Sequence, residues 1–84
     1  MKKIFIYTGP VCNYCDAAKR LFKRNNLEFS EVDISTGPEI LDQMISKSNG
    51  KRTIPQILFD HEHIGGYTEL RELEKEKKLL ECLK

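Results

Sequence analysis

Residues 4–24 read IFIYTGPVCNYCDAAKRLFKR, in which a short apolar run is followed by a turn and by a segment of helical periodicity. The run over residues 3–7 is rich in β-branched and aromatic side chains, which is typical of a buried strand. Residues 13–24 are expected to form a helix, because apolar residues recur there at helical spacing: Ala17, Ala18, Leu21 and Phe22. Cys12 therefore lies in a strand-to-helix turn, and Cys15 lies in the first helical turn.

This placement of the two cysteines has a chemical consequence. The N–H groups of a first helical turn have no partners within the helix, and the helix dipole is positive there. Both effects stabilise a thiolate at Cys12, which makes it a nucleophile and a good leaving group near neutral pH. Cys15 is close enough to form a small disulfide ring with it. A Cys-x-x-Cys pair near a βαβ pattern is typical of a redox-active site.

A structural zinc site is the alternative interpretation of this pair. Such a site needs further cysteine or histidine ligands at suitable spacing. The third cysteine, Cys82, is expected to contribute to packing or to lie on the surface. His61 and His63 would point to opposite faces of a strand, so they are expected to be turn and strand-edge residues. The redox pair is therefore favoured over zinc, and no metal is expected.

Size and charge limit the other possibilities. The chain of 84 residues is expected to form a single domain, residues 1–84, with one modest core. Its formal net charge is +1 with both signs interspersed, so neither a nucleic-acid nor a membrane partner is expected. The apolar run after residues 1–3 is too short for a signal peptide. A cytoplasmic protein with a transient, catalytic disulfide is therefore expected.

The remaining elements are expected in the order β-α-β-α-β-β-α. The second strand, residues 27–34, should contain an irregularity or end early near Glu31, because its apolar residues change face along it: Leu27 and Phe29 on one side, Val32 and Ile34 on the other. The first two strands must be parallel and joined by a right-handed crossover. Residues 56–60 and 63–64 are expected to form a hairpin.

The ends of the helices carry local signals. Residues 25–26 are expected to end the first helix, because asparagine tolerates the left-handed conformation that follows a helix. Residues 48–50 should end the second helix. Residues 79–83 are expected to form a last short helix or to continue the third one.

The starts of the second and third helices are marked by possible capping residues. Thr36 is the expected cap of the second helix, with Pro38 in its first turn and Glu39 completing a capping box. The third helix is expected after Gly65–Gly66, with Thr68 as its N-cap.

A second group of residues favours the binding of a peptide. Pro55 stands at a strand start, and a cis bond before it would turn backbone groups toward Cys12, where an extended peptide can pair with them. Gly65–Gly66 allows another backbone to approach closely, and the free N–H groups of Tyr67 and Thr68 form an anion site. A small peptide thiol with a carboxylate at each end would suit such a site.

Four motifs together resemble those of the glutaredoxins, in particular the small bacterial dithiol type: Ile6–Thr8, Cys12–Cys15, Arg52–Ile57 and His63–Tyr67. The resemblance covers nearly the whole chain, in order and at the right spacings. It implies an α/β thioredoxin fold, a four-stranded mixed sheet of order 2-1-3-4 flanked by helices, with the third strand antiparallel to the first. It also implies an enzyme that uses glutathione to reduce protein disulfides and protein–glutathione mixed disulfides.

The resemblance assigns roles to individual residues. Cys12 is the expected nucleophile and Cys15 the expected resolving thiol. The glutathione-binding residues it implies are Tyr14, Thr53, Ile54, Pro55 (as a cis-proline), Gly66, Tyr67 and Thr68. Lys51 or Arg52 is expected to hold the glycine carboxylate. The expected partners are glutathione and disulfide-containing or glutathionylated proteins, ribonucleotide reductase among them, and a monomer is expected.

The chain departs from the family pattern at two positions. Asn13 stands where the family usually has proline, which leaves the redox potential open. Gly9 stands where a basic residue is common, which leaves open how the glycine carboxylate is held.

Two other function classes are compatible with these motifs. The first is an iron–sulfur carrier, in which Cys12 from each of two subunits and two glutathiones ligate a [2Fe–2S] cluster. The second is a thioredoxin-like protein reduced by a reductase. The absence of tryptophan and the presence of Gly65–Tyr67 argue against the second class.

Overall fold

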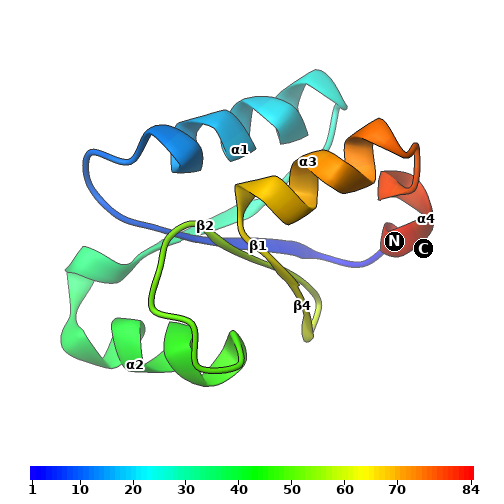
Figure 1. Cartoon of the computed structure of the whole chain (residues 1–84). Helices are drawn as coiled ribbons and strands as arrows, with labels where there is room; N and C mark the ends of the chain where they lie inside the picture. Colours follow the sequence, from blue (N-terminus) through cyan, green and yellow to red (C-terminus); the bar gives the residue numbers. More distant parts are fainter.

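The computed structural model describes all 84 residues, and its strands and main helices follow one another in the order that the sequence predicts (Figure 1). Their bounds are β1 Ile4–Thr8, α1 Asn13–Arg24, β2 Ser30–Asp33, the short 3-10 helix η1 Ile34–Thr36, α2 Pro38–Lys47, β3 Gln56–Phe59, β4 Glu62–Gly65, α3 Tyr67–Lys75 and α4 Leu79–Leu83. None of the helices combines the length and the apolar character needed to cross a membrane.

The four strands form one mixed sheet in the order β2-β1-β3-β4. β1 and β2 are parallel, with Phe5 opposite Ser30, whereas β1 and β3 are antiparallel, with Ile6 opposite Ile57. β3 and β4 form the expected hairpin, and their pairing shifts register between Ile57 and Leu58. The predicted sheet order and strand directions are confirmed.

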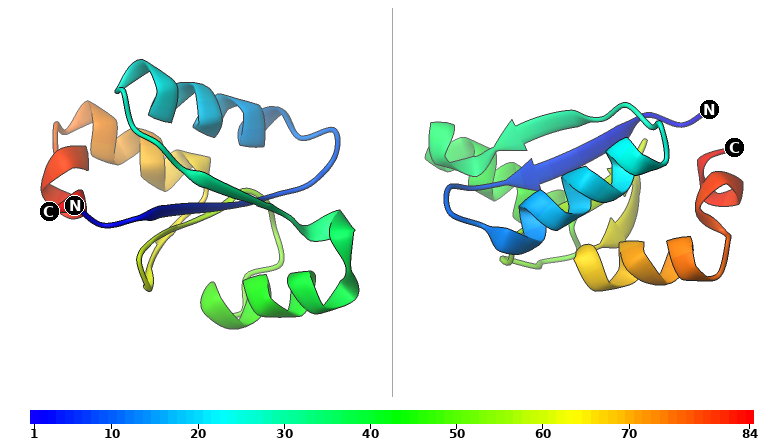
Figure 2. Two further views of the ribbon diagram at one scale, coloured as in Figure 1. Left: turned by 180° about the vertical axis from the view of Figure 1, so that it is seen from behind. Right: turned by 90° about the horizontal axis from the view of Figure 1, so that it is seen from above.

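Helices cover both faces of the sheet, with α1, α3 and α4 on one side and α2 on the other (Figure 2). The alternation of side chains along β1 explains both layers, because Ile4 and Ile6 point to one side and Phe5 and Tyr7 to the other. The larger core lies under α1 and α3 and consists of these buried residues: Ile4, Ile6, Ala18, Leu21, Phe22, Leu27, Ile57, Phe59, Leu70, Leu79 and Leu83. The smaller core lies under α2 and is built around Tyr7, Met44 and Leu58. The start of α1 is thereby fixed at one end of a packed sheet.

The second strand is shorter than predicted. Pairing with β1 begins only at Ser30 and ends at Asp33, where η1 follows. The predicted change of face is nevertheless present, because Leu27 and Phe29 contact the larger core whereas Val32 contacts the smaller one. The prediction of a strand from residue 27 was wrong because the chain first packs these side chains beneath α1, before it reaches β1.

Two predicted helix caps were also wrong. The N-cap of α2 is Gly37, and Thr36 instead donates its hydroxyl hydrogen to the carbonyl oxygen of Asp33 within η1. The N-cap of α3 is Gly66, and Thr68 lies inside the helix. The predicted ends of the first two helices are confirmed, since Asn26, Asn49 and Gly50 adopt positive φ angles of 58°, 55° and 84°.

Candidate active site

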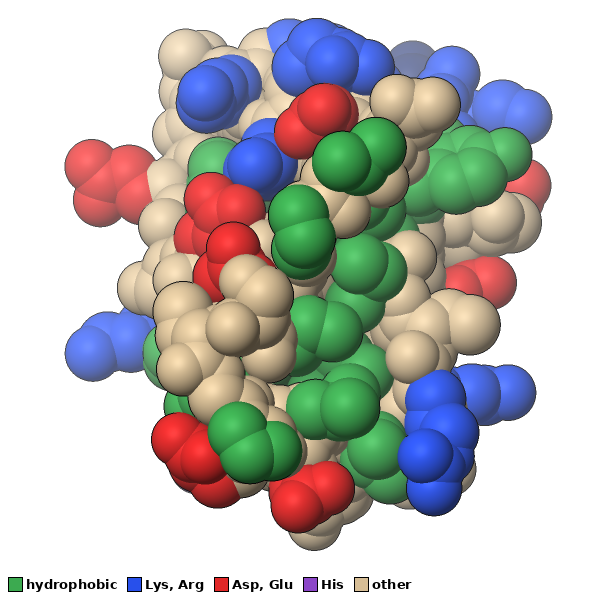
Figure 3. Space-filling view, turned by 90° about the vertical axis from the view of Figure 1, so that its left-hand side faces the viewer, with side chains coloured by type: hydrophobic (Ala, Val, Ile, Leu, Met, Phe, Trp, Pro, Cys, Tyr) green, Lys and Arg blue, Asp and Glu red, His purple; other side chains and the backbone are tan.

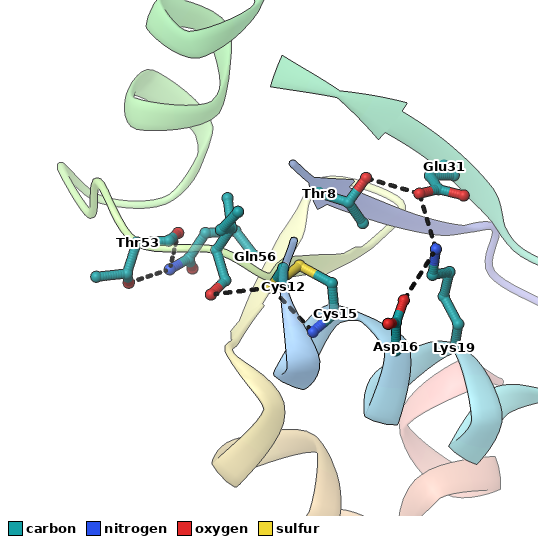
Figure 4. The surroundings of a disulfide bond; sticks show 9 residues. Thr8, Cys12, Cys15, Asp16, Lys19, Glu31, Thr53 and Gln56 are labelled. Atoms are coloured by element: carbon teal, nitrogen blue, oxygen red, sulfur yellow. Dashed lines mark hydrogen bonds and ion pairs between the residues drawn. A yellow bond between two sulfur atoms is a disulfide. The ribbon is translucent and has the colours of Figure 1, made fainter. Parts of the chain in front are cut away.

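The two cysteines lie at the start of α1 (Figure 4) and differ in their access to solvent. Cys12 is the N-cap residue, with extended backbone angles of φ −130° and ψ 103°, and Cys15 lies in the first turn. Their Cα atoms are 5.2 Å apart, and their Sγ atoms are joined in a disulfide. Cys12 is partly exposed, whereas Cys15 is only 1% exposed. A molecule that approaches from solvent can therefore reach Sγ of Cys12 but not Sγ of Cys15.

The start of α1 offers backbone N–H donors on the side of Cys12. The N–H of Cys15 donates a hydrogen bond to it over 3.1 Å. The N–H groups of Asn13 and Tyr14 have no backbone partner within the chain. Together with the helix dipole, these donors favour a thiolate at Cys12 once the disulfide is reduced.

The segment formed by residues 52–55 lies opposite Cys12. The Ile54–Pro55 peptide bond is cis, as the resemblance implied. No backbone–backbone hydrogen bond involves residues 52–55. The carbonyl oxygen of Ile54 lies 4.0 Å from Sγ of Cys12. An unpaired backbone edge is thus placed directly beside the exposed sulfur.

A shallow groove with a volume of ≈ 110 Å³ adjoins this edge. It is lined by Tyr14, Thr53, Ile54, Pro55, Gly66, Tyr67 and Thr68. The rings of Tyr14 and Tyr67 are stacked, with their centroids 5.9 Å apart. The structure thus brings together all of the predicted groove residues except Arg52, which is exposed just outside it. Lys51 lines a neighbouring hollow that shares Thr53 and Gly66 with the groove.

The start of α3 closes one end of the groove. A Cβ atom added at Gly66 would lie 3.3 Å from the carbonyl oxygen of Pro55, so a glycine keeps these two backbones in close contact. The N–H of Gly66 donates to Oε1 of Glu69 over 2.7 Å. The N–H groups of Tyr67 and Thr68 have no backbone partner and can receive an anion.

Comparison with known proteins agrees with this arrangement. The chain matches the family model described as Glutaredoxin over residues 4–64. It is 42% identical over 77 residues to glutaredoxin 1 of Rickettsia conorii, a match that covers 90% of this chain and 76% of that protein. The chain belongs to the glutaredoxin family. Glutaredoxins are thiol–disulfide oxidoreductases, so this chain is an enzyme of that class.

Other glutaredoxins support the same assignment. The glutaredoxin of Neisseria meningitidis serogroup A is 36% identical over 77 residues, covering 90% of this chain and 89% of that protein. The solution structure of glutaredoxin from Brucella melitensis superimposes with a TM-score of 0.86 at 43% identity, covering 100% of this chain and 90% of that one. The crystal structure of a buckwheat glutaredoxin–glutathione complex has the same fold, with a TM-score of 0.86 at 22% identity over 98% of this chain and 76% of that one. The fold is therefore the thioredoxin fold of the glutaredoxins.

The structure gives a reason for one departure from the glutaredoxin pattern. A Cβ atom at Gly9 would lie 2.7 Å from Cδ1 of Ile54, a distance at which one of the two must move. A side chain at position 9 would therefore require the end of the Ile54 side chain to shift. Lys51 and Arg52 are the basic residues that directly precede the groove residue Thr53 in the sequence.

The face that carries the β1–α1 loop is apolar at its centre (Figure 3). Hydrophobic side chains gather in a band across it, with acidic side chains on one flank and basic ones along the top and at a lower corner. Val11 and Tyr14, on either side of Cys12 in the sequence, are 103% and 66% exposed. Val11 also adopts a φ of 51°, which is rare for a β-branched residue. Exposed apolar side chains thus stand on both sides of Cys12 in the sequence.

Sequence reasoning missed a charged cluster close to the cysteines (Figure 4). The buried hydroxyl of Thr8 donates to Oε2 of Glu31 over 2.7 Å, and Nζ of Lys19 donates to the same oxygen over 3.1 Å. The hydrogen bond from Thr8 and that from Lys19 lower the pKa of Glu31. The only sequence signal of this cluster is the spacing of three residues between Asp16 and Lys19, which is compatible with an ion pair on one helix face.

Sequence reasoning also missed a polar chain behind Thr53. Gln56, predicted only as a strand residue, is 3% exposed, and its side chain bonds to both Thr53 and His63. His63 was expected to be a strand-edge residue without further role. No sequence signal connects these residues, because the β3–β4 hairpin brings them together.

Proposed function

We propose that this chain is a glutathione-dependent thiol–disulfide oxidoreductase that reduces protein–glutathione mixed disulfides and protein disulfides. The observation that carries the proposal is the position of Sγ of Cys12, which lies beside the unpaired backbone edge at Ile54, a residue that also lines the groove. A nucleophilic sulfur next to a backbone edge suits a substrate whose sulfur is carried on an extended peptide. Glutathione is such a peptide.

The reduction of a mixed disulfide needs only one protein thiol. The thiolate of Cys12 attacks the glutathionyl sulfur, a new S–S bond joins Cys12 to glutathione, and the target protein leaves as a thiolate. The thiolate of a second glutathione then attacks the bound glutathionyl sulfur. Oxidised glutathione leaves, and the thiolate of Cys12 is restored.

The reduction of a protein disulfide needs the second cysteine. Cys12 attacks one substrate sulfur and forms a mixed disulfide, and the first substrate thiolate leaves. The thiolate of Cys15 then attacks Sγ of Cys12, which forms the internal disulfide and releases the second substrate thiolate. The burial of Cys15 suits this role, because it can reach Cys12 but not an external substrate. Two glutathiones, oxidised together to their disulfide, reduce the internal disulfide.

The groove suits the two ends of glutathione. Its cysteinyl backbone would pair with Ile54, and Tyr14 and Tyr67 would form a wall beside it. The γ-glutamyl carboxylate would accept hydrogen bonds from the free N–H groups of Tyr67 and Thr68, with Gly66 allowing a close approach. Lys51 or Arg52 would hold the glycine carboxylate. The buckwheat glutaredoxin, which shares the fold, was solved with glutathione bound.

The proposal extends to partners and cellular setting. The expected partners are glutathionylated or disulfide-containing proteins, including ribonucleotide reductase. The chain is expected to act on them as a monomer. The chain would work in the cytoplasm as a single domain over residues 1–84. Its substrates would contact the apolar surface around Val11.

Two cysteine variants test the proposal in an assay coupled to glutathione reductase. Cys12→Ser should lose activity on both a glutathionylated peptide and a protein disulfide. Cys15→Ser should keep activity on the glutathionylated peptide and lose it on the protein disulfide. Turnover by Cys12→Ser, together with loss of both activities in Cys15→Ser, would reverse the assigned roles.

Cluster binding is a second candidate. Exposure of Cys12 leaves room for a second subunit, and a glutaredoxin structure solved for a study of metal binding is 44% identical to this chain with a TM-score of 0.75. This chain supplies one exposed active-site thiol, so a [2Fe–2S] cluster would need two chains and two glutathiones. Absorption spectroscopy after anaerobic reconstitution with glutathione separates the candidates, because a colourless monomer would exclude the carrier.

A further inference from the structure

The segment that faces Cys12 is held by a side chain instead of by backbone pairing. Residues 52–55 make no backbone–backbone hydrogen bond. Nε2 of Gln56 donates to the carbonyl oxygen of Thr53 over 3.0 Å and to Oγ1 of Thr53 over 3.1 Å. Gln56 is buried, and its amide is therefore the polar restraint on this segment.

The amide of Gln56 is itself oriented by a histidine. Because its nitrogen faces the carbonyl oxygen of Thr53, its oxygen must face the other way. Oε1 of Gln56 lies 2.7 Å from Nε2 of His63, so this ring nitrogen must carry the hydrogen. Nδ1 of His63 is then an acceptor, and Nδ2 of Asn49 donates to it over 3.1 Å. The chain Asn49–His63–Gln56–Thr53 thus has one consistent set of donors and acceptors.

The environment of His63 favours the neutral ring that this chain requires. Burial lowers the pKa of His63, and the nearby Lys51 lowers it further, whereas Glu69 acts in the opposite direction. A protonated ring would carry a hydrogen on Nδ1, opposite the hydrogens of the Asn49 amide. The four residues therefore stay aligned at neutral pH.

The restraint selects which backbone groups a bound peptide can reach. The carbonyl oxygen of Thr53 is occupied by Gln56, while the N–H and C=O of Ile54 remain free beside Cys12. Neighbouring residues of an extended segment present their backbone groups to opposite sides, so the bond from Gln56 to the carbonyl oxygen of Thr53 helps to fix the side to which Ile54 presents its own groups. Ordering the segment in advance also lowers the entropy lost on binding.

We infer that Gln56 and His63 are positioning residues that set the orientation of the backbone edge, and with it the preference for substrates carried on a glutathionyl peptide. Neither residue contacts the reacting sulfurs. Each acts through Thr53 and its neighbour Ile54. The inference rests on the function proposed above and gives a role to two residues to which the resemblance assigned none.

The test compares two forms of one target peptide, one modified by glutathione and one by cysteamine. Cysteamine presents the same disulfide without a peptide backbone or carboxylates. The readout is the ratio of kcat/KM for the two forms, since a loss of folded protein lowers both values equally and leaves their ratio unchanged. The rate of Cys12 alkylation by iodoacetamide, a small probe that needs no groove, is measured in parallel.

Two replacements of His63 separate its hydrogen bonds. His63→Asn keeps an acceptor near the position of Nδ1 but loses the donor to Gln56, whereas His63→Gln keeps a donor near the position of Nε2. The glutathionyl/cysteaminyl ratio should fall about tenfold in His63→Asn and stay within about twofold of wild type in His63→Gln. Gln56→Met should also lower the ratio about tenfold. Alkylation of Cys12 should be unchanged in all three.

Gln43→Met is the matched control for Gln56→Met. Gln43 accepts a hydrogen bond from Tyr7 on the α2 side of the sheet, away from the groove. The glutathionyl/cysteaminyl ratio of Gln43→Met should therefore equal that of wild type. A wild-type ratio near one would overturn the proposed function itself. A high wild-type ratio that His63→Asn and Gln56→Met both retain would overturn only the positioning role. An equal fall in His63→Asn and His63→Gln would do the same.

Discussion

The carbonyl oxygen of Ile54 lies 4.0 Å from Sγ of Cys12, although 42 residues separate them in the sequence. The cysteine is held by the start of α1, and the isoleucine by the segment that leads into β3. β1 and β3 are adjacent strands, so the sheet fixes the distance between the two. The juxtaposition of a nucleophile and a free backbone edge is therefore a property of the fold as a whole.

The thiol of Cys12 should react as a thiolate at neutral pH. The hydrogen bond from the N–H of Cys15 and the unpaired N–H groups of the first turn all favour the anion. The rate of iodoacetamide alkylation plotted against pH should have a midpoint well below roughly 8.5, the usual value for free cysteine. The alkylation rate of Cys82, measured over the same pH range in the Cys12→Ser protein, is the internal comparison. A midpoint near that usual value would contradict the activation of Cys12.

Asn13→Pro should make the cysteine pair more reducing. Asn13 is the first residue of α1, where proline fits, so the variant should fold. Proline removes an N–H near Cys12 and stiffens the turn, which disfavours the thiolate and eases ring closure. Redox titration in glutathione buffers should give wild type a redox potential above that of Asn13→Pro by up to roughly 30 mV, equivalent to about 1.4 kcal/mol for this two-electron couple. A more reducing wild type would show that the sign is wrong.

Gly66→Ala should weaken binding in the groove. The new Cβ would lie 3.3 Å from the carbonyl oxygen of Pro55, so the start of α3 and the segment before β3 must separate slightly. KM for a glutathionylated peptide should rise about fivefold, or about 1 kcal/mol, with little change in kcat.

Gly50→Ala is the control for Gly66→Ala. A Cβ atom added at Gly50 would face open space, but the φ of 84° at this residue is unfavourable for alanine. It should lower the free energy of unfolding by about 1 kcal/mol without changing KM. Equal KM values for the two variants would contradict the steric argument.

Acid should weaken the contact between α1 and α3. Glu74 accepts hydrogen bonds from Arg24, Asn25 and Arg71, and the bond from Arg24 is the main cause that lowers its pKa from 4.5. A carboxyl with a lowered folded-state pKa stabilises the fold above its unfolded value and loses that contribution as the pH falls through the folded value. Glu74→Gln should therefore have a lower Tm than wild type at pH 7, and the difference should shrink below pH 4.5. A constant difference down to pH 3 would contradict this.

The sequence predicted those elements whose signals are local. The helix over residues 13–24 has a clear apolar period and an asparagine end, and its predicted bounds match α1. The Cys-x-x-Cys pair lies at its start for the same local reason. The sequence itself indicated Pro55, Tyr67 and Thr68 as binding residues, whereas the role of Tyr14 followed from the family resemblance, since nothing local places Tyr14 beside Tyr67.

Features set by contacts between distant residues could not be predicted. The start of β2 depends on where β1 becomes available for pairing, and the caps of α2 and α3 depend on how the preceding chain enters each helix. Gly66 displaced Thr68 as N-cap because its backbone must approach Pro55. The pairing of Gln56 with His63 requires the β3–β4 hairpin to be formed.

The most direct measurement of the central claim is the identity of the trapped intermediate. Cys15→Ser is incubated with a glutathionylated peptide, the reaction is stopped with acid, and the protein is digested and examined by mass spectrometry. Glutathione should be attached to Cys12, with Cys82 unmodified, because the attack on the glutathionyl sulfur needs only the exposed thiol. Attachment of the target peptide instead of glutathione to Cys12, or of glutathione to Cys82 alone, would contradict the account.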